Sequence, residues 1–373
     1  MLFRSFKEET QNAALSGIKI ADFSRVLAGP YATMMLADLG AEVIKVERPG
    51  LGDETRGWGP PFDSQGRSSY FQSVNRNKQS IALDLNNPED SLRAQELILE
   101  SDVVVENFGF DGMKKFNLDY ETVSKKHPKL VYCSITGFGS SIRARELAGY
   151  DLLVQAMSGL MSITGSPSSE PNKVGVALID VLAGLHAVSG ILGALRARDK
   201  FGSGQQVEIN LFSSALSGMV NQSGAYVAAG VVPGRLGNSH PSIVPYGVFQ
   251  SSDRSFILAV GNDQQFARLA NILGISINER NSTNSARVKN RSEVEQTLNA
   301  SFSSKSAETW IELLNRERIP SGPINDISEA FKLAEGFDLD PIIEIGDSRT
   351  VANPIKFSKS KIIYRKPPPS LDN

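Results

Sequence analysis

Cysteine and histidine are scarce in this sequence of 373 residues, which has one cysteine (Cys133) and three histidines (His127, His186 and His240). A single cysteine excludes a disulfide within the chain, and these four residues are not spaced like the ligands of a zinc site. We therefore expect no bound metal. A reducing compartment is expected too, which is the cytoplasm by default or the mitochondrial matrix if the source is eukaryotic.

An excess of one charge and a long uninterrupted apolar run are also absent. The 39 basic and 41 acidic residues are dispersed, which does not favour nucleic acid or an anionic membrane as a partner. The longest apolar run, 181–197, is interrupted by His186, Ser189 and Arg196 and falls short of the roughly 20 residues of a membrane span, so we expect a buried helix there. Residues 1–17 contain no apolar segment typical of a signal peptide.

The chain alternates between short β-rich runs and helical runs, which is typical of βαβ units and predicts an α/β fold with a parallel sheet. A strand is expected at 18–24, a helix at 30–39 and a strand at 41–47. Further strands are expected at 80–85, 102–106, 129–135, 174–179 and 206–211. After about residue 217 the composition changes to runs that contain Gly, Ser and Pro. A hairpin is expected at 249–260 and helices at 264–273 and 307–315, which indicates a second domain.

The phosphate-binding motifs that often follow a first strand are missing. The stretch after residue 24 is not G-x-G-x-x-G, no P-loop occurs, and neither G-x-S-x-G nor a credible Cys/His pair is present. Dehydrogenase, nucleotide triphosphatase and hydrolase functions are therefore disfavoured.

Asp180 stands where the predicted strand 174–179 passes into the predicted helix 181–198. Ligands collect at the carboxyl ends of strands in α/β sheets, and the N–H groups of a helix N-terminus stabilise a carboxylate. An ionised aspartate there is a competent nucleophile, but an aspartate that only caps the helix has the same position. Position alone leaves both interpretations open.

Two other polar features can be interpreted either as parts of a binding site or as ordinary structural features. Arg48 follows the strand 41–47, where a cation could meet a phosphate, but it could also be an ordinary surface arginine. Tyr150 and Asp151 open a helical run that could be any helix start.

Several stretches together resemble the class III CoA-transferase family, which includes formyl-CoA transferase, carnitine CoA-transferases and α-methylacyl-CoA racemases. The likeness covers almost the whole chain and includes GVALIDVLAGLHAVSGILGAL (175–195), which contains Asp180. The other stretches that carry it are 17–53, 70–85, 103–108, 132–139, 148–165 and 204–212. Their number and order favour the nucleophile interpretation of Asp180.

The resemblance implies an interlocked homodimer of ring-like chains, each with a Rossmann-like large domain made from both termini and a smaller α+β domain. We assign 1–217 to the large domain, 218–335 to a linker and the small domain, and 336–373 to a return to the large domain. It also implies that Asp180 forms an acyl-aspartyl anhydride and then an aspartyl-CoA thioester. Coenzyme A esters would be substrates, with no tightly bound cofactor.

CoA-binding residues carried over by position are spread along the first 151 residues. They are Val26, Leu27, Arg48, Leu83, Asp84, Leu85, Asn86, Asn107, Phe108, Gly109, Lys115, Ala148, Gly149, Tyr150 and Asp151. Asn86 stands where a lysine is common, and the run after Asn107 also departs from the frequent pattern.

Four stretches, 52–62, 242–249, 259–269 and 319–326, look most like the dicarboxylate CoA-transferases of the family. This implies succinyl-CoA as donor and a dicarboxylate such as glutarate as acceptor, and Arg56 or Arg76 could pair with the second carboxylate.

Two rival functions share the fold. A racemase of the family has histidine in its G-H-D motif, whereas this chain has Gly149-Tyr150-Asp151, and tyrosine, with an ordinary pKa of about 10, is poorly matched to proton transfer at neutral pH. The second rival is a CoA-ester-binding protein without turnover, which the presence of Asp180 disfavours.

Overall fold

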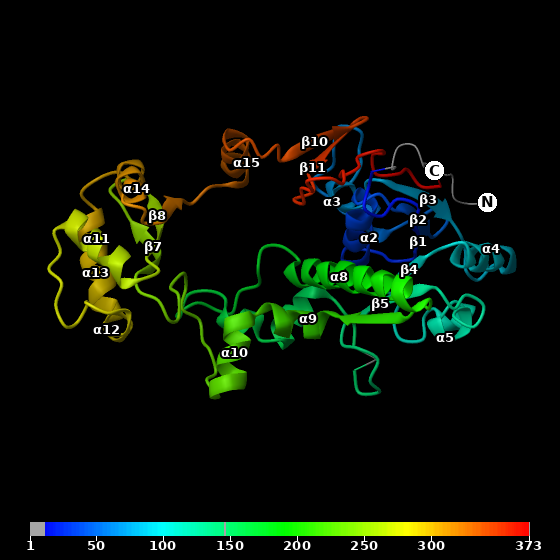
Figure 1. Ribbon diagram of the computed structural model, residues 1–373, viewed down its shortest axis with the longest axis horizontal. Helices are drawn as coiled ribbons and strands as arrows, with labels where there is room; N and C mark the ends of the chain where they lie inside the picture. Colours follow the sequence, from blue (N-terminus) through cyan, green and yellow to red (C-terminus); the bar gives the residue numbers. More distant parts are fainter. Residues whose placement is uncertain (1–11, 145–146, 373) are drawn as a thin grey trace. The chain divides into compact units, whose positions relative to one another are not determined.

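The computed structural model describes residues 12–144 and 147–372, which form two compact units (Figure 1). Unit 1 draws on Met1–Leu160, Lys173–Val231 and Asp340–Asn373, and unit 2 draws on Met161–Asn172 and Val232–Leu339. The expected boundaries at 217/218 and 335/336 thus differ from the structural ones, and a short segment before residue 173 also belongs to unit 2.

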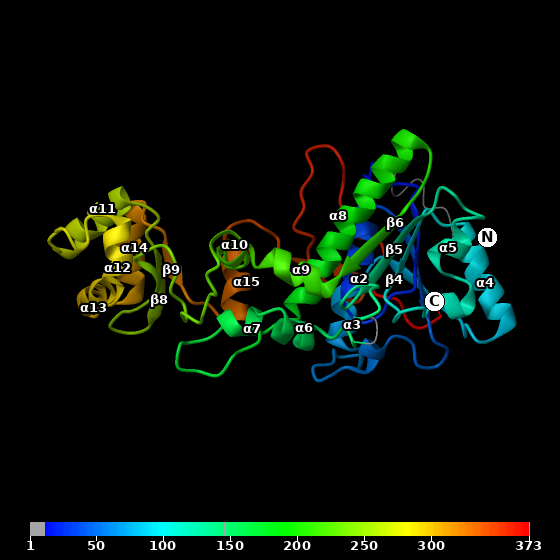
Figure 2. The same cartoon turned by 90° about the horizontal axis from the view of Figure 1, so that it is seen from below.

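Unit 1 is built on a sheet of six parallel strands in the order β3-β2-β1-β4-β5-β6 (Figures 1 and 2). This is the order of doubly wound α/β folds, in which the chain starts in the middle of the sheet and builds outward on both sides. The predicted α/β class with a parallel sheet is confirmed. The strands are β1 (Lys19–Asp22), β2 (Glu42–Glu47), β3 (Lys78–Ala82), β4 (Val103–Glu106), β5 (Val131–Thr136) and β6 (Gln206–Asn210).

The prediction of a strand at 174–179 is wrong. Residues 174–177 form an irregular segment, and the helix α8 begins at Leu178 and ends at Phe201. The side chain of Gln155 takes the place of a neighbouring strand, because its Oε1 accepts the N–H of Val174 and its Nε2 donates to the carbonyl of Val176. A short run of β-branched residues cannot be distinguished from other buried segments by its pattern alone.

Helices cover both faces of the sheet. One face carries the larger core, to which Ile20, Val43 and Val105 contribute, and the other face carries a core with Ala21 and Ile44. Neighbouring residues of each strand thus enter opposite cores, as expected for strands buried on both sides. Helices α2 (Ala28–Asp38), α6 (Asp151–Met157), α8 and α9 (Leu211–Gly218) cover the first face, and α4 (Pro88–Leu99) and α5 (Tyr120–Val123) cover the second.

Helix α8 runs along the sheet beside β5 and β6 and contacts α2 (Figure 2). By length and hydropathy alone it could cross a membrane, and it is the one helix in the described part of the chain of which this is true. Ile179, Ala183, Ala187 and Ile191 recur every four residues and are buried in the core of unit 1. The predicted helix is confirmed, and one of its faces is buried in this core.

Unit 1 contains several further elements. They are α3 (Ser69–Val74), α10 (Val220–Ala229), the 3₁₀ helices η1 (Glu54–Gly57) and η2 (Lys114–Phe116), and the antiparallel pair β10 (Ile342–Ile345) and β11 (Ser348–Val351), while α7 (Leu160–Ile163) lies where the chain passes into unit 2.

Unit 2 has its own core, which contains Phe256, Phe302 and Trp310. The predicted hairpin at 249–260 is confirmed as an antiparallel pair, to which a third strand adds. Its elements are β7 (Tyr246–Gln250), β8 (Ser255–Ala259), β9 (Ser321–Pro323), α11 (Asp263–Leu273), α12 (Asn284–Lys289), α13 (Arg291–Phe302), α14 (Ala307–Arg316) and α15 (Ile327–Gly336).

A buried carboxylate fastens the last residues of the chain to unit 1. Asp38 at the end of α2 is fully buried and accepts from Arg76 Nε and Nη2, at 3.0 and 2.6 Å. It also accepts from the side-chain amides of Asn77 and Asn353, and Arg76 donates in turn to the carbonyl of Val351. The segment after residue 340 is thus tied to the end of α2 through the buried side chains of Asp38, Arg76 and Asn353.

Asp38→Ala should destabilise the protein by about 3–5 kcal/mol, because it leaves the Arg76 guanidinium buried without its counterion. Urea unfolding measures this free energy. The control is Glu344→Ala, which removes the partner of Arg349 from an ion pair that is 73% and 70% exposed and should leave the unfolding midpoint unchanged. A loss for Asp38→Ala as small as that of the control would contradict a structural role for the buried pair.

Candidate active site

Two adjoining cavities open at the carboxyl ends of the parallel strands in unit 1. The first, of about 390 Å³, contains Asp180 in its lining and is called the Asp180 cavity; the second, of about 270 Å³, contains Arg48 and is called the Arg48 cavity. Arg25 and Phe108 line both, so the two spaces meet at these side chains. Loops after the carboxyl ends of strands are the usual ligand site of this sheet topology.

Asp180 lies in the first turn of α8, two residues after the helix begins, rather than at its cap. The N-terminus of α8 has no side-chain cap of its own. Asp151 Oδ1, from the start of α6, accepts the N–H groups of Ile179 and Asp180 at 2.8 and 3.4 Å. Gln155 donates to the other oxygen of Asp151. A carboxylate from a second helix therefore fixes the turn that carries Asp180.

Burial, and to a lesser extent the neighbouring charge of Asp151, together raise the pKa of Asp180 from 3.8 to about 7. Near neutral pH the carboxyl of Asp180 is therefore divided between its acid form and the ionised form that a nucleophile needs. Burial, with the charges of Asp180, Asp151 and Asp53, also raises the pKa of Tyr70 to about 12. Tyr70 thus stays neutral in the neighbourhood of Asp180.

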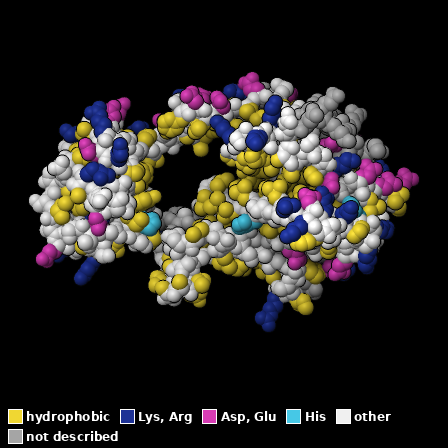
Figure 3. Space-filling view, viewed as in Figure 1, with side chains coloured by type: hydrophobic (Ala, Val, Ile, Leu, Met, Phe, Trp, Pro, Cys, Tyr) yellow, Lys and Arg dark blue, Asp and Glu magenta, His cyan; other side chains and the backbone are white. Residues whose placement is uncertain are grey.

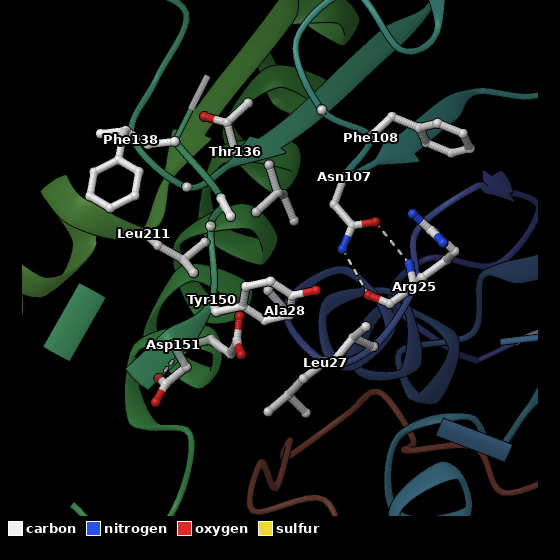
Figure 4. Close-up of a pocket in the computed structure, with 18 of the residues that line it drawn as sticks. Arg25, Leu27, Ala28, Asn107, Phe108, Thr136, Phe138, Tyr150, Asp151 and Leu211 are labelled. Carbon is white, nitrogen blue, oxygen red and sulfur yellow. Dashed lines mark hydrogen bonds between the residues drawn. The ribbon is translucent and has the colours of Figure 1, made fainter. Parts of the chain in front are cut away.

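The loop between β1 and α2 forms one wall of the Asp180 cavity. Val26 and Leu27 of the loop line it, and Leu27 precedes α2 without a side-chain cap. Figure 4 shows Leu27 beside Ala28, the first residue of α2, which also lines the cavity. The side chain of Asn107 accepts from the N–H of Arg25 and donates to its carbonyl, at 2.9 and 2.7 Å (Figure 4). The polar atoms of Asn107 therefore hold the backbone of this loop.

The opposite wall is made by the segment before α6, where two glycines touch. A Cβ at Gly149 would lie 2.5 Å from the Cα of Gly137, so a side chain at this position would collide with backbone. Ala148, Gly149, Tyr150 and Asp151 all line the Asp180 cavity. The contact between the glycines lets the chain bring Asp151 close enough to reach α8.

Charged groups gather at the junction of the two cavities. Glu54 pairs with both Arg25 and Arg48, and Arg25 also lies over the ring of Phe108. Within the described chain, Arg25 Nε and Glu54 Oε2 are buried without a hydrogen-bond partner. A guanidinium with a spare donor and a second arginine beside it suit an anionic group such as a phosphate.

The residues predicted to bind CoA fall into two groups with one exception. Val26, Leu27, Asn107, Phe108, Gly109 and Ala148 to Asp151 line the Asp180 cavity, and Arg48, Leu83, Asp84, Leu85, Asn86 and again Phe108 line the Arg48 cavity. Lys115 lines neither and is exposed on η2.

The two arginines predicted to meet a substrate carboxylate are placed elsewhere. Arg76 is buried against Asp38, and Arg56 pairs with both oxygens of Glu47 and stacks on Phe71. Neither lines the described part of either cavity. Carboxylates of unit 1 already neutralise the charges of Arg56 and Arg76. The structure therefore does not support either arginine as the partner of a substrate carboxylate.

Three residues of the site were not predicted from the sequence. Arg25, Glu54 and Trp58 line the Asp180 cavity, and Trp58 meets Tyr70 edge to face at 5.2 Å between ring centres. Glu54 and Trp58 belong to the stretch 52–62 that carried the family likeness, and Arg25 precedes Val26, so their neighbourhood was indicated. Among the described residues, no group of three or more His, Cys, Asp or Glu is placed to hold a metal ion.

Comparisons with known proteins agree on one family. The family model described as CoA-transferase family III matches residues 15–373. A succinate–glutarate CoA-transferase of Agrobacterium fabrum is 44% identical over 370 residues, covering 96% of this chain and 92% of the relative. A succinyl-CoA:glutarate CoA-transferase of Mus musculus is 40% identical, covering 96% and 84%. The crystal structure of a CAIB/BAIF family protein from Brucella suis superposes with a TM-score of 0.87 at 40% identity, covering 97% of each chain.

Proposed function

The chain belongs to CoA-transferase family III, and we propose that it moves CoA from succinyl-CoA to a dicarboxylate such as glutarate, with Asp180 as the nucleophile. The observation that carries this proposal is the position of Asp180: it lines a cavity at the carboxyl ends of the strands, on a helix start held by Asp151. The two relatives named above act on succinate or succinyl-CoA and glutarate, which supports the choice of acids.

The chemistry proceeds through two covalent forms of Asp180. Its carboxylate attacks the thioester carbonyl, which forms an acyl-aspartyl anhydride and releases the CoA thiolate. The thiolate attacks the aspartyl carbonyl, which releases the donor acid and leaves an aspartyl-CoA thioester. The acceptor carboxylate then attacks the aspartyl carbonyl, which forms a second anhydride, between the acceptor and Asp180, and releases the thiolate. The thiolate attacks the acceptor's acyl carbon, which forms the new CoA thioester and frees the carboxylate of Asp180. Every thioester broken is formed again, so no other source of energy is required.

The two cavities bind different ends of the CoA ester. We assign the nucleotide end of the CoA ester to the Arg48 cavity, because Arg25 and Arg48 supply positive charge at its mouth. The thioester end reaches the Asp180 cavity past Phe108, where Leu27 and Leu211 are among the apolar side chains that line it.

Arg48→Ala should raise the KM for the CoA ester about tenfold with a smaller change in kcat, because a contact to the nucleotide is present in ground and transition states alike. Steady-state kinetics with varied succinyl-CoA measure both constants. Arg93→Ala, which removes an exposed arginine paired with Asp90 on α4, is the matched control. An unchanged KM in Arg48→Ala would remove Arg48 from the binding site.

The substrate class is tested by comparing acceptors that differ in their second carboxylate. With succinyl-CoA as donor, kcat/KM for glutarate should exceed that for butyrate, which has a hydrogen in place of one carboxylate of glutarate, and that for oxalate. A pocket built to pair a free carboxylate leaves polar groups unpaired when that carboxylate is missing. Equal values for glutarate and butyrate would contradict the dicarboxylate assignment and leave the transferase assignment intact.

We also propose that the protein is an interlocked homodimer with a Rossmann-like large domain in each chain. In support, α10 buries none of its residues, and Val220, Tyr226 and Val227 on it are exposed, as are Leu152 of α6 and Leu185 of α8. Figure 3 shows such apolar side chains at the position of α10. Exposed apolar surface of this kind is typical of an interface. Analytical ultracentrifugation tests this, and a monomer at micromolar concentration would contradict it.

A further inference from the structure

The loop between β1 and α2 contains a residue in an unfavourable backbone conformation. Val26 has φ of +69°, in the left-handed region. A β-branched residue rarely adopts this region, because its side chain crowds the neighbouring backbone. Such a conformation persists only where the surrounding structure enforces it, and it is found most often at functional sites. The neighbours that enforce it at Val26 are therefore of interest.

Three side chains hold three successive backbone units of this loop. Lys45 Nζ donates to the carbonyl of Ser24 at 2.7 Å. Asn107 binds both polar groups of the Arg25 backbone. Asp53 accepts the N–H of Val26, at 3.2 and 3.4 Å to its two oxygens. We call Lys45, Asn107 and Asp53 the clamp. Asp53 binds the strained residue itself, and Lys45 and Asn107 bind the two residues before it.

Lys45 and Asp53 form an ion pair whose side chains are both fully buried, with 2.9 Å between Nζ and Oδ2. Burial alone would favour neutral Lys45, but the charges of Asp53, Asp22 and Glu47 outweigh it and hold the pKa of Lys45 above its ordinary value. Lys78 pairs with Asp22 nearby, so charges of both signs are balanced in the cluster. Because desolvating a buried pair offsets much of its attraction, stability alone is a weak reason for its presence.

The clamped loop is in contact with the helix that carries Asp180. A Cβ at Gly184, one turn after Asp180, would lie 2.8 Å from the carbonyl oxygen of Ala28, so α8 and the start of α2 touch through backbone. Leu27 and Ala28 line the same cavity as Asp180. A shift of the loop would therefore change the distance between Asp180 and whatever the loop holds.

We propose that the buried pair Lys45–Asp53 is a positioning device that holds Val26 in its left-handed conformation and so fixes the wall formed by Leu27 and Ala28 against which the CoA ester meets Asp180. The reference to the CoA ester rests on the proposed function. Lys45 and Asp53 do not touch the substrate; they act through the backbone of Ser24 and Val26. Misplacement of the ester by a fraction of an ångström should lower kcat, because the attack on the carbonyl depends on alignment.

The test combines Asp53→Asn with two substitutions at Val26. Asp53→Asn keeps the shape of the side chain and removes its charge, so the clamp weakens. Val26→Gly removes the penalty of a positive φ, and Val26→Ala removes the same part of the pocket wall but keeps the penalty. Asp63→Asn, at an acid that pairs with Arg67 away from the loop, is the control for the chemical change. The readouts are kcat and KM per folded active site, at a temperature well below each thermal midpoint.

We expect Asp53→Asn to lower kcat at least tenfold, in contrast to Arg48→Ala, whose effect is on KM. Val26→Gly combined with Asp53→Asn should have a kcat within threefold of Val26→Gly alone, whereas Val26→Ala combined with Asp53→Asn should still lose tenfold relative to Val26→Ala alone. If Asp53→Asn fails to fold, the glycine double variant should fold and the alanine double variant should not.

Each other outcome overturns the proposal. An unchanged kcat in Asp53→Asn means that the pair is structural only. Equal losses in the glycine and alanine double variants mean that Asp53 does not act through the backbone of Val26, and failure of both to fold means the same. The proposed function is judged separately: if the wild-type protein does not transfer CoA from succinyl-CoA, that function fails, and a glycine-specific recovery of the thermal midpoint in Asp53→Asn still reports on the clamp.

Discussion

Asp180→Ala is expected to lower CoA transfer by at least about a thousandfold, because removal of a nucleophile abolishes the covalent route and leaves only what binding provides. The variant should fold and should bind CoA with an affinity close to that of the wild-type protein, since the site that we propose for the nucleotide end is the Arg48 cavity, which Asp180 does not line. Isothermal titration with CoA and turnover with succinyl-CoA measure the two quantities. Retention of more than a few per cent of wild-type turnover would exclude Asp180 as the nucleophile.

The stability of Asp180→Asn should differ from wild type in a pH-dependent way. Burial raises the pKa of Asp180 to about 7 in the folded protein, against an ordinary value of 3.8. The folded wild-type protein therefore holds a proton that the unfolded chain has lost between these pH values, and its stability falls as the pH rises from about 4 to 7. The free energy of unfolding of the wild-type protein should fall by about 4 kcal/mol over this pH range, whereas Asp180→Asn, which has no proton to lose at this position, should not show this fall. Urea unfolding at pH 4 and pH 8 measures the difference.

Changes at Asp151 should have the next largest effect, because this carboxylate both holds the N-terminus of α8 and adds negative charge beside Asp180. Asp151→Ala removes the acceptor for the N–H of Ile179 and should lower kcat about 10- to 100-fold through misplacement of Asp180. Asp151→Asn keeps an acceptor oxygen but removes the charge. Its main effect should be on the pH dependence of the reaction.

In the wild-type protein, kcat/KM should fall as the pH decreases below about 7, because the carboxyl of Asp180 becomes protonated. In Asp151→Asn this acid limb should move to lower pH, since one of the causes that raise the pKa of Asp180 is gone. It should stay well above pH 4, because burial, the larger cause, remains. Asp199→Asn, at an exposed acid near the other end of α8, is the control. An acid limb that does not move would contradict an electrostatic coupling between Asp151 and Asp180.

The elements that the sequence predicted well are those with a local signal. Asn87 followed by Pro88 is such a signal at the start of α4, where the side chain of Asn87 accepts from the N–H groups of Glu89 and Asp90. The alternation of short strands and helices is also a local signal, and it correctly predicted a parallel sheet. The run 174–179 has β-branched residues but no strand to pair with, because β6 occupies the place beside β5. Asp180 was therefore placed at a helix start correctly, but not at the end of a strand.

Pairing between distant charges could not be predicted in the same way. Arg76 and Arg56 have the charge that a dicarboxylate needs, but their carboxylate partners, Asp38 and Glu47, lie on other elements and meet them only in the fold. Lys45 lies in the middle of β2 and is fully buried, where Asp53 and the carbonyl of Ser24 bind its amine. Partners distant in sequence determine whether such a charge serves a ligand or the structure.

The measurement that tests the central claim most directly is mass spectrometry of the protein after brief incubation with succinyl-CoA. The transferase chemistry predicts a covalent adduct with the mass of a succinyl group or of CoA, on the peptide that contains Asp180, and its absence from Asp180→Ala treated in the same way. Borohydride reduction should convert the activated carboxyl of Asp180 to an alcohol, which marks the residue. Turnover without any adduct under these conditions, or with an adduct on another residue, would contradict the assignment of Asp180 as the carboxylate that carries the acyl group and the CoA.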